Sequence, residues 1–588
     1  MTNCQPAPTS LAIEAQGIVK QFTRPGQSHP VTALSQVSLT VRTGSLTAII
    51  GPDGAGKTTF MRLVCGLLKS NAGSLSVLGT DVASHPQAVQ DCIGYMPQKF
   101  GLYEDLSVQE NLDLYANLHA VPQAMRQDRF QKLLDLTGLS PFTQRMAGKL
   151  SGGMKQKLGL ACTLVSMPPV LLLDEPTVGV DPLSRRELWQ ILDTLSASGS
   201  LTVLVATAYL EEAEHCHDVY ILHKGHILAQ GAPDTLCHYA QGRCYVVRPP
   251  ENVPPRLIQA ALIDKTEAVA DAVPEGGVVR FSLTPKASLE DLSLPGLSVT
   301  AVPARLEDSF MGLLRQQEPP LPSHYSRPDV TAAKRTGTGR KIIEVRDIVR
   351  RFGDFIAVNH TSFSVYEGEI FGLLGPNGAG KSTTFRMLCG LLPVSSGQIS
   401  VAGVNLRTAR AQARAHIGYV AQKFSLYTTL SVEENLRFFG SAYGLRGRRL
   451  DQRIKAVIEE FDLSGFRHMP AGSLPGGYKQ RLSMAAALLH KPPILFLDEP
   501  TSGIDPLARR LFWRQITDLS AKGATIIVTT HFMEEAEYCD RIMIQDQGQL
   551  IAIGTPSAIR KQGGSSPTMN DAFIHIVESG RHHQEVSP

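Results

Sequence analysis

The chain has 588 residues, which is too many for one hydrophobic core and predicts two to four domains. Its 57 lysine and arginine residues nearly balance 54 aspartate and glutamate residues, giving a formal net charge of +3. This balance argues against a protein that binds nucleic acid through bulk charge. The longest apolar runs are only a few residues long, so the sequence predicts no transmembrane helix.

The first motif along the chain is a glycine-rich loop between a strand and a helix. Apolar residues 46–50 predict a buried strand, and the periodic segment 60–68 predicts a helix. The loop between them, GPDGAGKT from Gly51, has the P-loop pattern. Backbone N–H groups in such a loop surround phosphate oxygens, and the helix N-terminus adds positive potential. We expect Lys57 to reach the β- and γ-phosphates and Thr58 to hold Mg²⁺.

Two adjacent acids end a later apolar strand, VLLLDEP (170–176). Two carboxylates at the end of a buried strand are costly unless a cation or a reaction requires them. Asp174 suits the Mg²⁺ shell, and Glu175 suits the polarisation of an attacking water. The segment LSGGMKQ (150–156) precedes this strand and opens an apolar helix. It offers a second helix N-terminus for a phosphate group.

The middle of the chain has a different composition. Residues 241–340 contain twelve prolines, which excludes a long helical spacer. Patterning predicts a helix and three strands there: Pro254–Asp264, Cys244–Val247, Val278–Leu283 and Leu297–Val302. We expect a small α+β accessory domain at 241–316 and an exposed linker at 317–340. The segment LEDSFMGLL at the end of the accessory region predicts a helix similar to MNDAFIHIV near the C-terminus.

The motifs of the first region recur 324 residues later. A second P-loop begins at Gly375 and contains Lys381 and Ser382, and a second acidic strand end carries Asp498 and Glu499. A constant offset over more than 150 residues predicts two whole homologous domains. We place these domains at 11–240 and 341–564, and a C-terminal helix and tail at 565–588.

Together these motifs resemble the ABC ATPase family, and the resemblance covers both copies. It rests on the P-loops, LSGGMKQ, Gln98 and Gln422, the two DEP strands, and the turns at Asp181 and Asp505. A narrower resemblance is to the ATP-binding subunits of ABC-2-type exporters, including tandem multidrug-efflux proteins. The implied fold is α/β: two P-loop NTPase domains, each with a RecA-like core, an antiparallel β subdomain and an α-helical subdomain, plus the α+β appendage.

The resemblance also implies a site in which ATP lies between the P-loop of one domain and the SGG segment of the other. The implied catalytic residues are Glu499, His531 and Glu175, and the implied Mg²⁺ ligands are Thr58, Asp174, Ser382 and Asp498. Aromatic side chains near the first strand of each copy would stack on adenine, with simple packing as the alternative. The expected ATP contacts are Gly51, Pro52, Asp53, Gly54, Ala55, Gly56, Lys57, Thr58, Thr59, Gly375, Pro376, Asn377, Gly378, Ala379, Gly380, Lys381, Ser382, Thr383, Gln98, Gln422, Ser151, Gly152, Gly153, Gly476, Gly477, Phe22 and Phe352.

The sequence departs from the family pattern in two places. Ala208 stands where the second copy has the switch histidine His531, and Pro475 replaces the serine of the SGG segment. In a head-to-tail pair both departures fall in the site built on Lys57. We expect that site to hold ATP but hydrolyse it poorly. The alternative is that both sites turn over, with a water or Thr207 covering for the histidine.

The resemblance implies separate integral-membrane permease subunits as partners, with a periplasmic adaptor protein as a further partner and no nucleic acid. The permease subunits would dock on residues 99–115 and 423–439. The competing interpretation of these segments is ordinary helix packing. The chain would lie peripherally on the cytoplasmic face of the inner membrane and power efflux of a drug-like or amphipathic substrate. Two alternatives are the ATPase of a sugar importer and a soluble tandem ATPase acting on ribosomes or DNA. The proline-rich 241–340 region disfavours the ribosomal alternative, whose members carry a highly charged helical linker.

Overall fold

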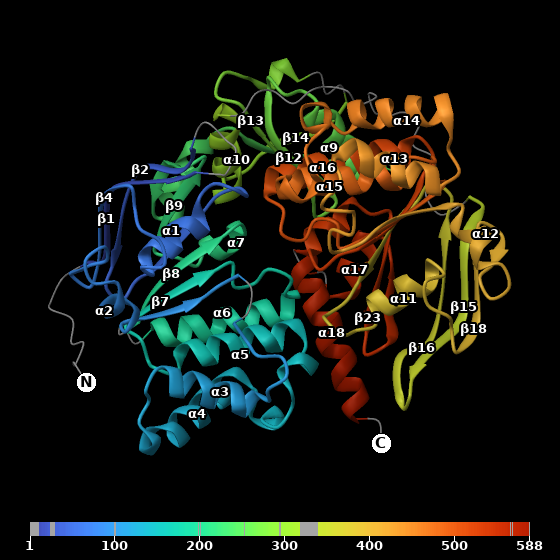
Figure 1. Ribbon diagram of the computed structural model, residues 1–588. Helices are drawn as coiled ribbons and strands as arrows, with labels where there is room; N and C mark the ends of the chain where they lie inside the picture. The colour runs from blue at the N-terminus through green and yellow to red at the C-terminus, as the bar shows by residue number, and fades with distance from the viewer. Residues whose placement is uncertain are drawn as a thin grey trace. The chain divides into compact units, whose positions relative to one another are not determined.

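The computed structural model describes residues 11–23, 30–98, 101–197, 199, 201–251, 253–292, 296–317, 339–564, 566 and 568–586. The chain forms two compact units (Figure 1). The first unit contains Met1–Gln241 and Pro303–Glu318, and the second contains Gly242–Val302 and Pro319–Pro588.

A six-stranded sheet forms the core of the first unit, in the order β10-β9-β3-β8-β7-β6. All neighbours in it are parallel except β9 and β10. The central strands are continuous apolar runs because helices cover both faces of such a sheet. The strands are β3 (Leu46–Ile50), β6 (Ile93–Met96), β7 (Val170–Asp174), β8 (Thr202–Thr207), β9 (Asp218–His223) and β10 (His226–Gly231).

Two further layers complete this unit. The antiparallel sheet β2-β1-β4-β5 contains β1 (Leu11–Phe22), β2 (Val31–Arg42), β4 (Ala72–Val77) and β5 (Thr80–Asp81). A helical subdomain is built from α3 (Val108–Leu118), α4 (Gln123–Thr137) and α5 (Gly152–Leu164), which enclose their own apolar cluster. The other helices are α1 (Lys57–Val64), α2 (Pro86–Gln90), α6 (Pro182–Ser196), α7 (Leu210–Ala213), α8 (Pro233–Cys237) and α10 (Leu306–Gln317).

The second unit repeats this architecture. Its core sheet has the order β20-β21-β22-β17-β23-β24, and its antiparallel sheet has the order β16-β15-β18-β19. Its strands are β15 (Lys341–Phe352), β16 (Phe355–Tyr366), β17 (Ile370–Leu374), β18 (Ser396–Val401), β19 (Val404–Asn405), β20 (Ile417–Val420), β21 (Ile494–Asp498), β22 (Thr525–Thr529), β23 (Arg541–Asp546) and β24 (Gln549–Gly554). Its helices are α11 (Lys381–Leu388), α12 (Arg410–Arg414), α13 (Val432–Ala442), α14 (Gly447–Glu460), α15 (Gly476–Ala487), α16 (Pro506–Ala521), the 3₁₀ helix η7 (Met533–Tyr538), α17 (Pro556–Gln562) and α18 (Met569–Val586).

The second unit also contains a small four-stranded antiparallel sheet, in the order β12-β13-β11-β14. We call residues 242–302 the accessory sheet; it contains β11 (Cys244–Val247), α9 (Pro255–Ile263), β12 (Val269–Glu275), β13 (Val278–Leu283) and β14 (Val299–Ala301). The helix and three of the strands match elements predicted from the sequence, whereas β12 was not predicted. Figure 1 shows α9 beside α16.

The helix α10 follows the accessory sheet in sequence but groups with the first unit. Its buried residues Leu306, Phe310 and Leu314 form an apolar face, and the helix packs on α8. The C-terminal helix α18 packs on α17 in the same manner. The sequence placed this helix in the accessory domain 241–316, and the grouping instead makes it a counterpart of α18. In the described part of the chain, no helix is both long enough and apolar enough to span a bilayer.

Candidate active sites

The P-loop of the first unit closes tightly around the amino group of Lys57. Lys57 Nζ donates to Gly51 O at 2.8 Å and to Pro52 O at 3.3 Å, and its side chain is buried. Gly56 precedes α1 with φ of 113°, a left-handed conformation that favours glycine. A Cβ at Gly51 would meet the Leu222 carbonyl oxygen at 2.1 Å. The loop therefore needs glycine at both positions to keep its backbone N–H groups around a central space.

The acids at the end of β7 differ in their surroundings. Thr58 Oγ1 donates to Asp174 Oδ1 at 3.1 Å, and Tyr95 donates to Asp174 Oδ2 at 3.3 Å. Burial raises the pKa of Asp174, although the hydrogen bonds from Thr58 and Tyr95 oppose this effect. A hydroxyl and a carboxylate on adjoining elements are hard oxygen donors of the kind Mg²⁺ prefers. The residues present fit the predicted Mg²⁺ site.

The second acid, Glu175, has a strained backbone. Its φ is 52°, and the equivalent Glu499 has φ of 44°. A glutamate in this region costs about 1–3 kcal/mol and persists only where the surroundings enforce it. Gln98 Nε2 donates to Glu175 Oε2 at 2.5 Å, and Lys57 Nζ lies 3.5 Å from Glu175 Oε1. The structure thus brings Lys57 and Gln98, two of the residues expected at the first ATP site, onto the carboxylate of Glu175.

The second unit builds a similar P-loop. Lys381 Nζ donates to Gly375 O at 2.6 Å and to Pro376 O at 2.8 Å. Asp498 Oδ1 accepts a hydrogen bond from Thr529 Oγ1 at 2.7 Å, and Ser382 lies exposed at the start of α11. Burial raises the pKa of Asp498, as it does for its counterpart in the first unit. Most of the remaining predicted loop residues lie in the turns before α1 and α11: Asp53, Gly54 and Ala55 in the first, and Asn377, Gly378, Ala379 and Gly380 in the second. Thr59 and Thr383 lie in the first turn of α1 and of α11.

The candidate catalytic glutamate of the second unit, Glu499, has a histidine beside it. His531 Nδ1 lies 3.3 Å from Glu499 Oε2, and Gln422 Nε2 donates to the same oxygen at 2.6 Å. Burial alone would raise the pKa of Glu499, but the contacts with His531, Lys381 and Gln422 outweigh it and the pKa is lowered. The carboxylate is therefore held in its charged form. His531 is 1% exposed, so this contact is shielded from solvent.

In the described part of the first unit the equivalent position, directly after β8, holds Ala208, which has no imidazole to make this contact. Thr207, the candidate substitute, donates to Glu212 Oε2 at 2.6 Å and accepts from the Tyr209 backbone N–H at 3.0 Å. Thr530 makes the same bond to Glu535 at 2.6 Å. Thr207 is thus the structural counterpart of Thr530, and its hydroxyl hydrogen is already donated to the buried Glu212. This geometry disfavours Thr207 as a replacement for the histidine.

The two SGG segments begin their helices differently. Ser151 is the N-cap of α5, and its hydroxyl accepts from the Met154 backbone N–H at 3.3 Å. Pro475 is the N-cap of α15 and makes no side-chain capping bond. A Cβ at Gly153 would meet Ser184 Oγ at 2.3 Å, so the first segment needs glycine there. Gly152 opens α5, and Gly476 and Gly477 open α15.

The candidate adenine-stacking rings lie at the ends of two strands. Phe22 ends β1 and is 37% exposed, and Phe352 ends β15 and is 48% exposed. Lys20 Nζ lies 5.1 Å from the Phe22 ring centroid, and Arg350 Cζ lies 4.5 Å from that of Phe352. Both rings are partly exposed and each lies beside a basic side chain, so stacking on adenine stays a prediction.

Sequence reasoning missed the residue that holds the loop after each glutamine. The buried Asn435 exchanges hydrogen bonds with the Tyr427 backbone, at 3.0 Å in both directions. Asn111 makes the equivalent bonds to the Tyr103 backbone, at 3.0 and 3.1 Å. Tyr103 and Tyr427 are 57% and 49% exposed. These loops belong to the predicted docking segments 99–115 and 423–439, of which residues 99 and 100 lie outside the described residues. An asparagine within an apolar helix was the available signal.

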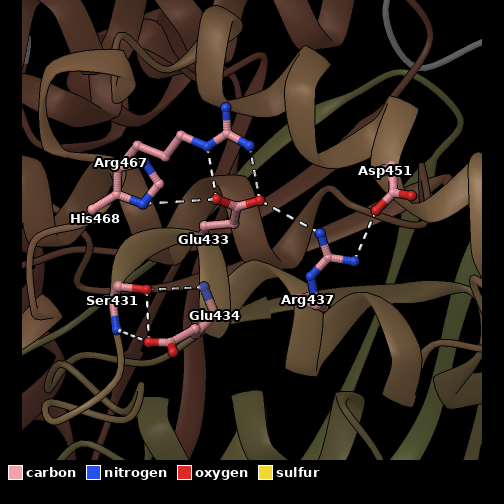
Figure 2. Close-up of polar contacts among 7 residues, drawn as sticks. All are labelled: Ser431, Glu433, Glu434, Arg437, Asp451, Arg467 and His468. Carbon is pink, nitrogen blue, oxygen red and sulfur yellow. Dashed lines mark hydrogen bonds and ion pairs between the residues drawn. The ribbon is translucent and has the colours of Figure 1, made fainter.

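An ion-pair network reinforces the docking segment of the second unit (Figure 2). Arg467 pairs with Glu433 through two bonds of 2.7 and 2.8 Å, and Arg437 bridges Glu433 to Asp451. The hydrogen bond from Arg467, with the charges of both arginines, lowers the pKa of Glu433 to about 2. In the first unit Gln109 occupies the place of Glu433 and donates to Asp113 at 3.1 Å.

Comparison with known proteins gives consistent matches in both halves. The family model described as "ABC transporter" matches residues 34–178 and 358–502. The chain is 48% identical over 576 residues to the "Probable multidrug ABC transporter ATP-binding protein YbhF" of Escherichia coli, covering 96% of this chain and 97% of that protein. It is 41% identical to the "Linearmycin resistance ATP-binding protein LnrL" of Bacillus subtilis, over 42% of this chain and 82% of the relative. It is 44% identical to the "Nod factor export ATP-binding protein I" of Burkholderia lata, over 37% of this chain and 72% of the relative.

Proposed function

Because this chain belongs to the ATP-binding proteins of ABC transporters, we propose that it powers the efflux of a drug-like or amphipathic substrate through separate integral-membrane subunits. The chain carries two ABC ATPase domains and hydrolyses ATP. The observation that carries the export proposal is the 48% identity to a multidrug ATP-binding protein over nearly the whole chain. Relatives named for resistance and for export support the same direction of transport.

The permease subunits would dock on the exposed loops around Tyr103 and Tyr427. Each loop follows a glutamine, Gln98 or Gln422, that donates to the glutamate of its ATP site. Movement of the loop would therefore shift that glutamine and change the position of the glutamate. The buried asparagines Asn111 and Asn435 hold the backbone of each loop in one conformation through their hydrogen bonds. The chain would then lie peripherally at the cytoplasmic face of the inner membrane, with a periplasmic adaptor completing the assembly.

The two copies would pair head to tail, so that each ATP lies between one P-loop and the other copy's SGG segment. The second P-loop would then work with Ser151, Gly152 and Gly153, and the first with Gly476 and Gly477. We propose that only the second site turns over rapidly. Support comes from the contact of His531 with Glu499 at 3.3 Å, which the first site cannot form because it has Ala208.

In the second site, Glu499 would orient the attacking water and accept its proton, because its lowered pKa keeps the carboxylate charged. Gln422 and His531 fix the orientation of that carboxylate. Asp498 with Ser382, and Asp174 with Thr58, would hold Mg²⁺, which supplies charge neutralisation at the phosphate oxygens. Lys381 would stabilise the developing charge on the γ-phosphate.

The export proposal is tested by efflux of a fluorescent amphipathic dye from cells that express the chain together with its membrane partners. Lower dye accumulation than in cells carrying the Glu499→Gln variant supports efflux. Equal accumulation, or accumulation that rises with the active chain, contradicts it. Purification of the tagged chain from detergent-solubilised membranes checks the partner: recovery without any integral-membrane protein, or with ribosomes, would contradict the assignment.

A further inference from the structure

The accessory sheet contacts the second ATPase domain at two segments that follow its catalytic residues. One segment is α16, which begins directly after Asp505 and the turn that follows Glu499. The other runs from η7 to the start of β23, and η7 begins two residues after His531. Both segments therefore connect by a few residues of backbone to the groups that act on the γ-phosphate.

Two buried arginines of α16 make ion pairs with the accessory sheet. Arg510 Nε lies 3.2 and 3.3 Å from the two carboxylate oxygens of Asp271, on β12. Arg514 forms a two-bond pair with Asp264, at the end of α9, with distances of 2.8 and 2.6 Å. Both arginines are 1% exposed. The planar guanidinium makes each pair directional, so the pairs fix the orientation of α16 against the sheet.

A second set of contacts reaches the strand that leads to the P-loop. Arg256 on α9 pairs with Asp540, and both side chains are buried. The other oxygen of Asp540 accepts from the backbone N–H of Ile370 at 2.9 Å, and Ile370 is the first residue of β17. The P-loop begins where β17 ends. Arg256 therefore acts on the P-loop strand through one intervening side chain.

The tip of the β12–β13 hairpin makes the last contact. Burial raises the pKa of Glu537, on η7, and the charge of Arg560 and the backbones of Gly276 and Gly277 beside the carboxylate oppose that rise. Arg560 Nη1 lies 3.0 Å from the same carboxylate. Gly276 and Gly277 have φ of 64° and 81°, the left-handed conformation that a tight glycine turn adopts. A Cβ at either glycine would lie 3.2 Å from the Arg560 guanidinium.

Among the described residues, the equivalent positions of the first ATPase domain hold different side chains or differ in exposure. The counterparts of Arg510 and Arg514 are Arg186 and Gln190 on α6, and both are exposed. The counterpart of Asp540 is His217, whose Nδ1 accepts from the Leu46 backbone N–H at 3.1 Å. The first domain thus fixes its P-loop strand with its own imidazole. The second domain uses a carboxylate that needs Arg256 to balance its buried charge.

We propose that the accessory sheet is a positioning element of the second ATP site and that Arg256 is its principal positioning residue. By holding Asp540, η7 and α16 in fixed orientation, the sheet keeps Glu499 and His531 in contact beside the P-loop. A hydrophobic surface would bind the sheet without constraining its angle, whereas the three arginine–carboxylate pairs between the sheet and the domain define one arrangement. This inference rests on the proposed function in one respect, namely that the second site is the hydrolytic one.

The test uses the full-length chain in a Glu175→Gln background, where hydrolysis reports the second site. In that background Arg256→Gln should lower kcat about tenfold or more while KM for ATP changes less than about threefold. Arg510→Gln should act in the same direction, and Arg186→Gln at the equivalent exposed position should change neither constant. A loss of thermal stability with kcat unchanged per folded molecule would overturn the proposal.

A double variant separates positioning from stability. Arg256→Gln with Asp540→His reproduces the arrangement of the first domain, in which histidine accepts the strand bond without an arginine. We expect Tm to recover and kcat to stay low, because the sheet is no longer attached at that point. Recovery of kcat would show that the pair serves stability alone. If Arg256→Gln does not accumulate as folded protein, Arg514→Gln gives a milder test, since its partner Asp264 is partly exposed. An inactive Glu175→Gln parent would instead refute the proposed role of the second site.

Discussion

Replacing the two catalytic glutamates one at a time should give very different losses of activity. In Glu499→Gln the amide oxygen can still accept from Gln422, whose bond to Glu499 is 2.6 Å long, so the side chain keeps its place and loses its charge. A positioned general base contributes about 10²–10⁴-fold in rate, which corresponds to about 3–5 kcal/mol in the activation free energy. We expect steady-state ATPase turnover to fall by that factor. In Glu175→Gln we expect most of the turnover to remain.

The assay is phosphate release by the purified full-length chain, with ATP binding measured on the same samples by a fluorescent ATP analogue. Binding should be little changed in both variants, because each P-loop lysine keeps its bond to a carbonyl of its own loop, Lys57 to Gly51 and Lys381 to Gly375. The two substitutions are chemically identical, so each is the control for the other. Equal losses in the two variants would refute the asymmetric model. Loss of binding in Glu499→Gln would refute the argument that only charge is removed.

Three further outcomes are expected. In a Glu499→Gln background, Ala208→His with Pro475→Ser should restore measurable ATP hydrolysis. The first site then regains the histidine and the serine that it lacks. No gain in hydrolysis would mean that other features disable that site. Phe352→Leu should raise KM for ATP severalfold with kcat unchanged, since aromatic contacts are worth about 0.5–1.5 kcal/mol, and an unchanged KM would assign the ring to another role. Glu433 has its pKa depressed from 4.5 to about 2, chiefly by Arg467 (Figure 2), so its stabilisation is present above pH 4.5 and disappears as pH falls toward 2. The Tm difference between the wild type and Glu433→Gln should be constant near neutral pH and narrow below about pH 4.5, and a pH-independent difference would contradict the ion-pair account.

The chemistry of each ATP site could be predicted from the sequence because it is encoded locally. The P-loop, the acidic strand end and the position of His531 each lie within a short segment whose backbone form follows from its own residues. The two departures, Ala208 and Pro475, were visible for the same reason. The strained φ values of Glu175 and Glu499 were not visible, because they come from the packing around the strand ends.

The attachment of the accessory sheet could not be predicted, since its contacts join residues far apart in sequence. Arg510 and Asp271 are separated by 239 positions, and each alone is typical of a solvated surface charge. The strand β12 was missed because Asp271 and Pro274 interrupt its apolar pattern. The helix α10 was assigned to the accessory domain because it follows that sheet without a break, although its likeness to the C-terminal helix was the correct clue.

The path of the chain has a consequence for how this protein can be divided. The chain leaves the first unit after Gln241, returns to it at Pro303, and leaves it again after Glu318. No single break therefore separates two complete ATPases. A cut within 318–338 would leave the accessory sheet on the N-terminal fragment, although its contacts are with the second ATPase domain. A C-terminal fragment from residue 339 would expose Arg510 and Arg514, which the intact chain buries. Gene fission or recombination at the linker would thus be selected against. The two ATPase domains thus stay on one chain because each unit contains segments from both sides of a segment of the other in sequence. This reason is separate from any benefit of producing both domains in equal amounts.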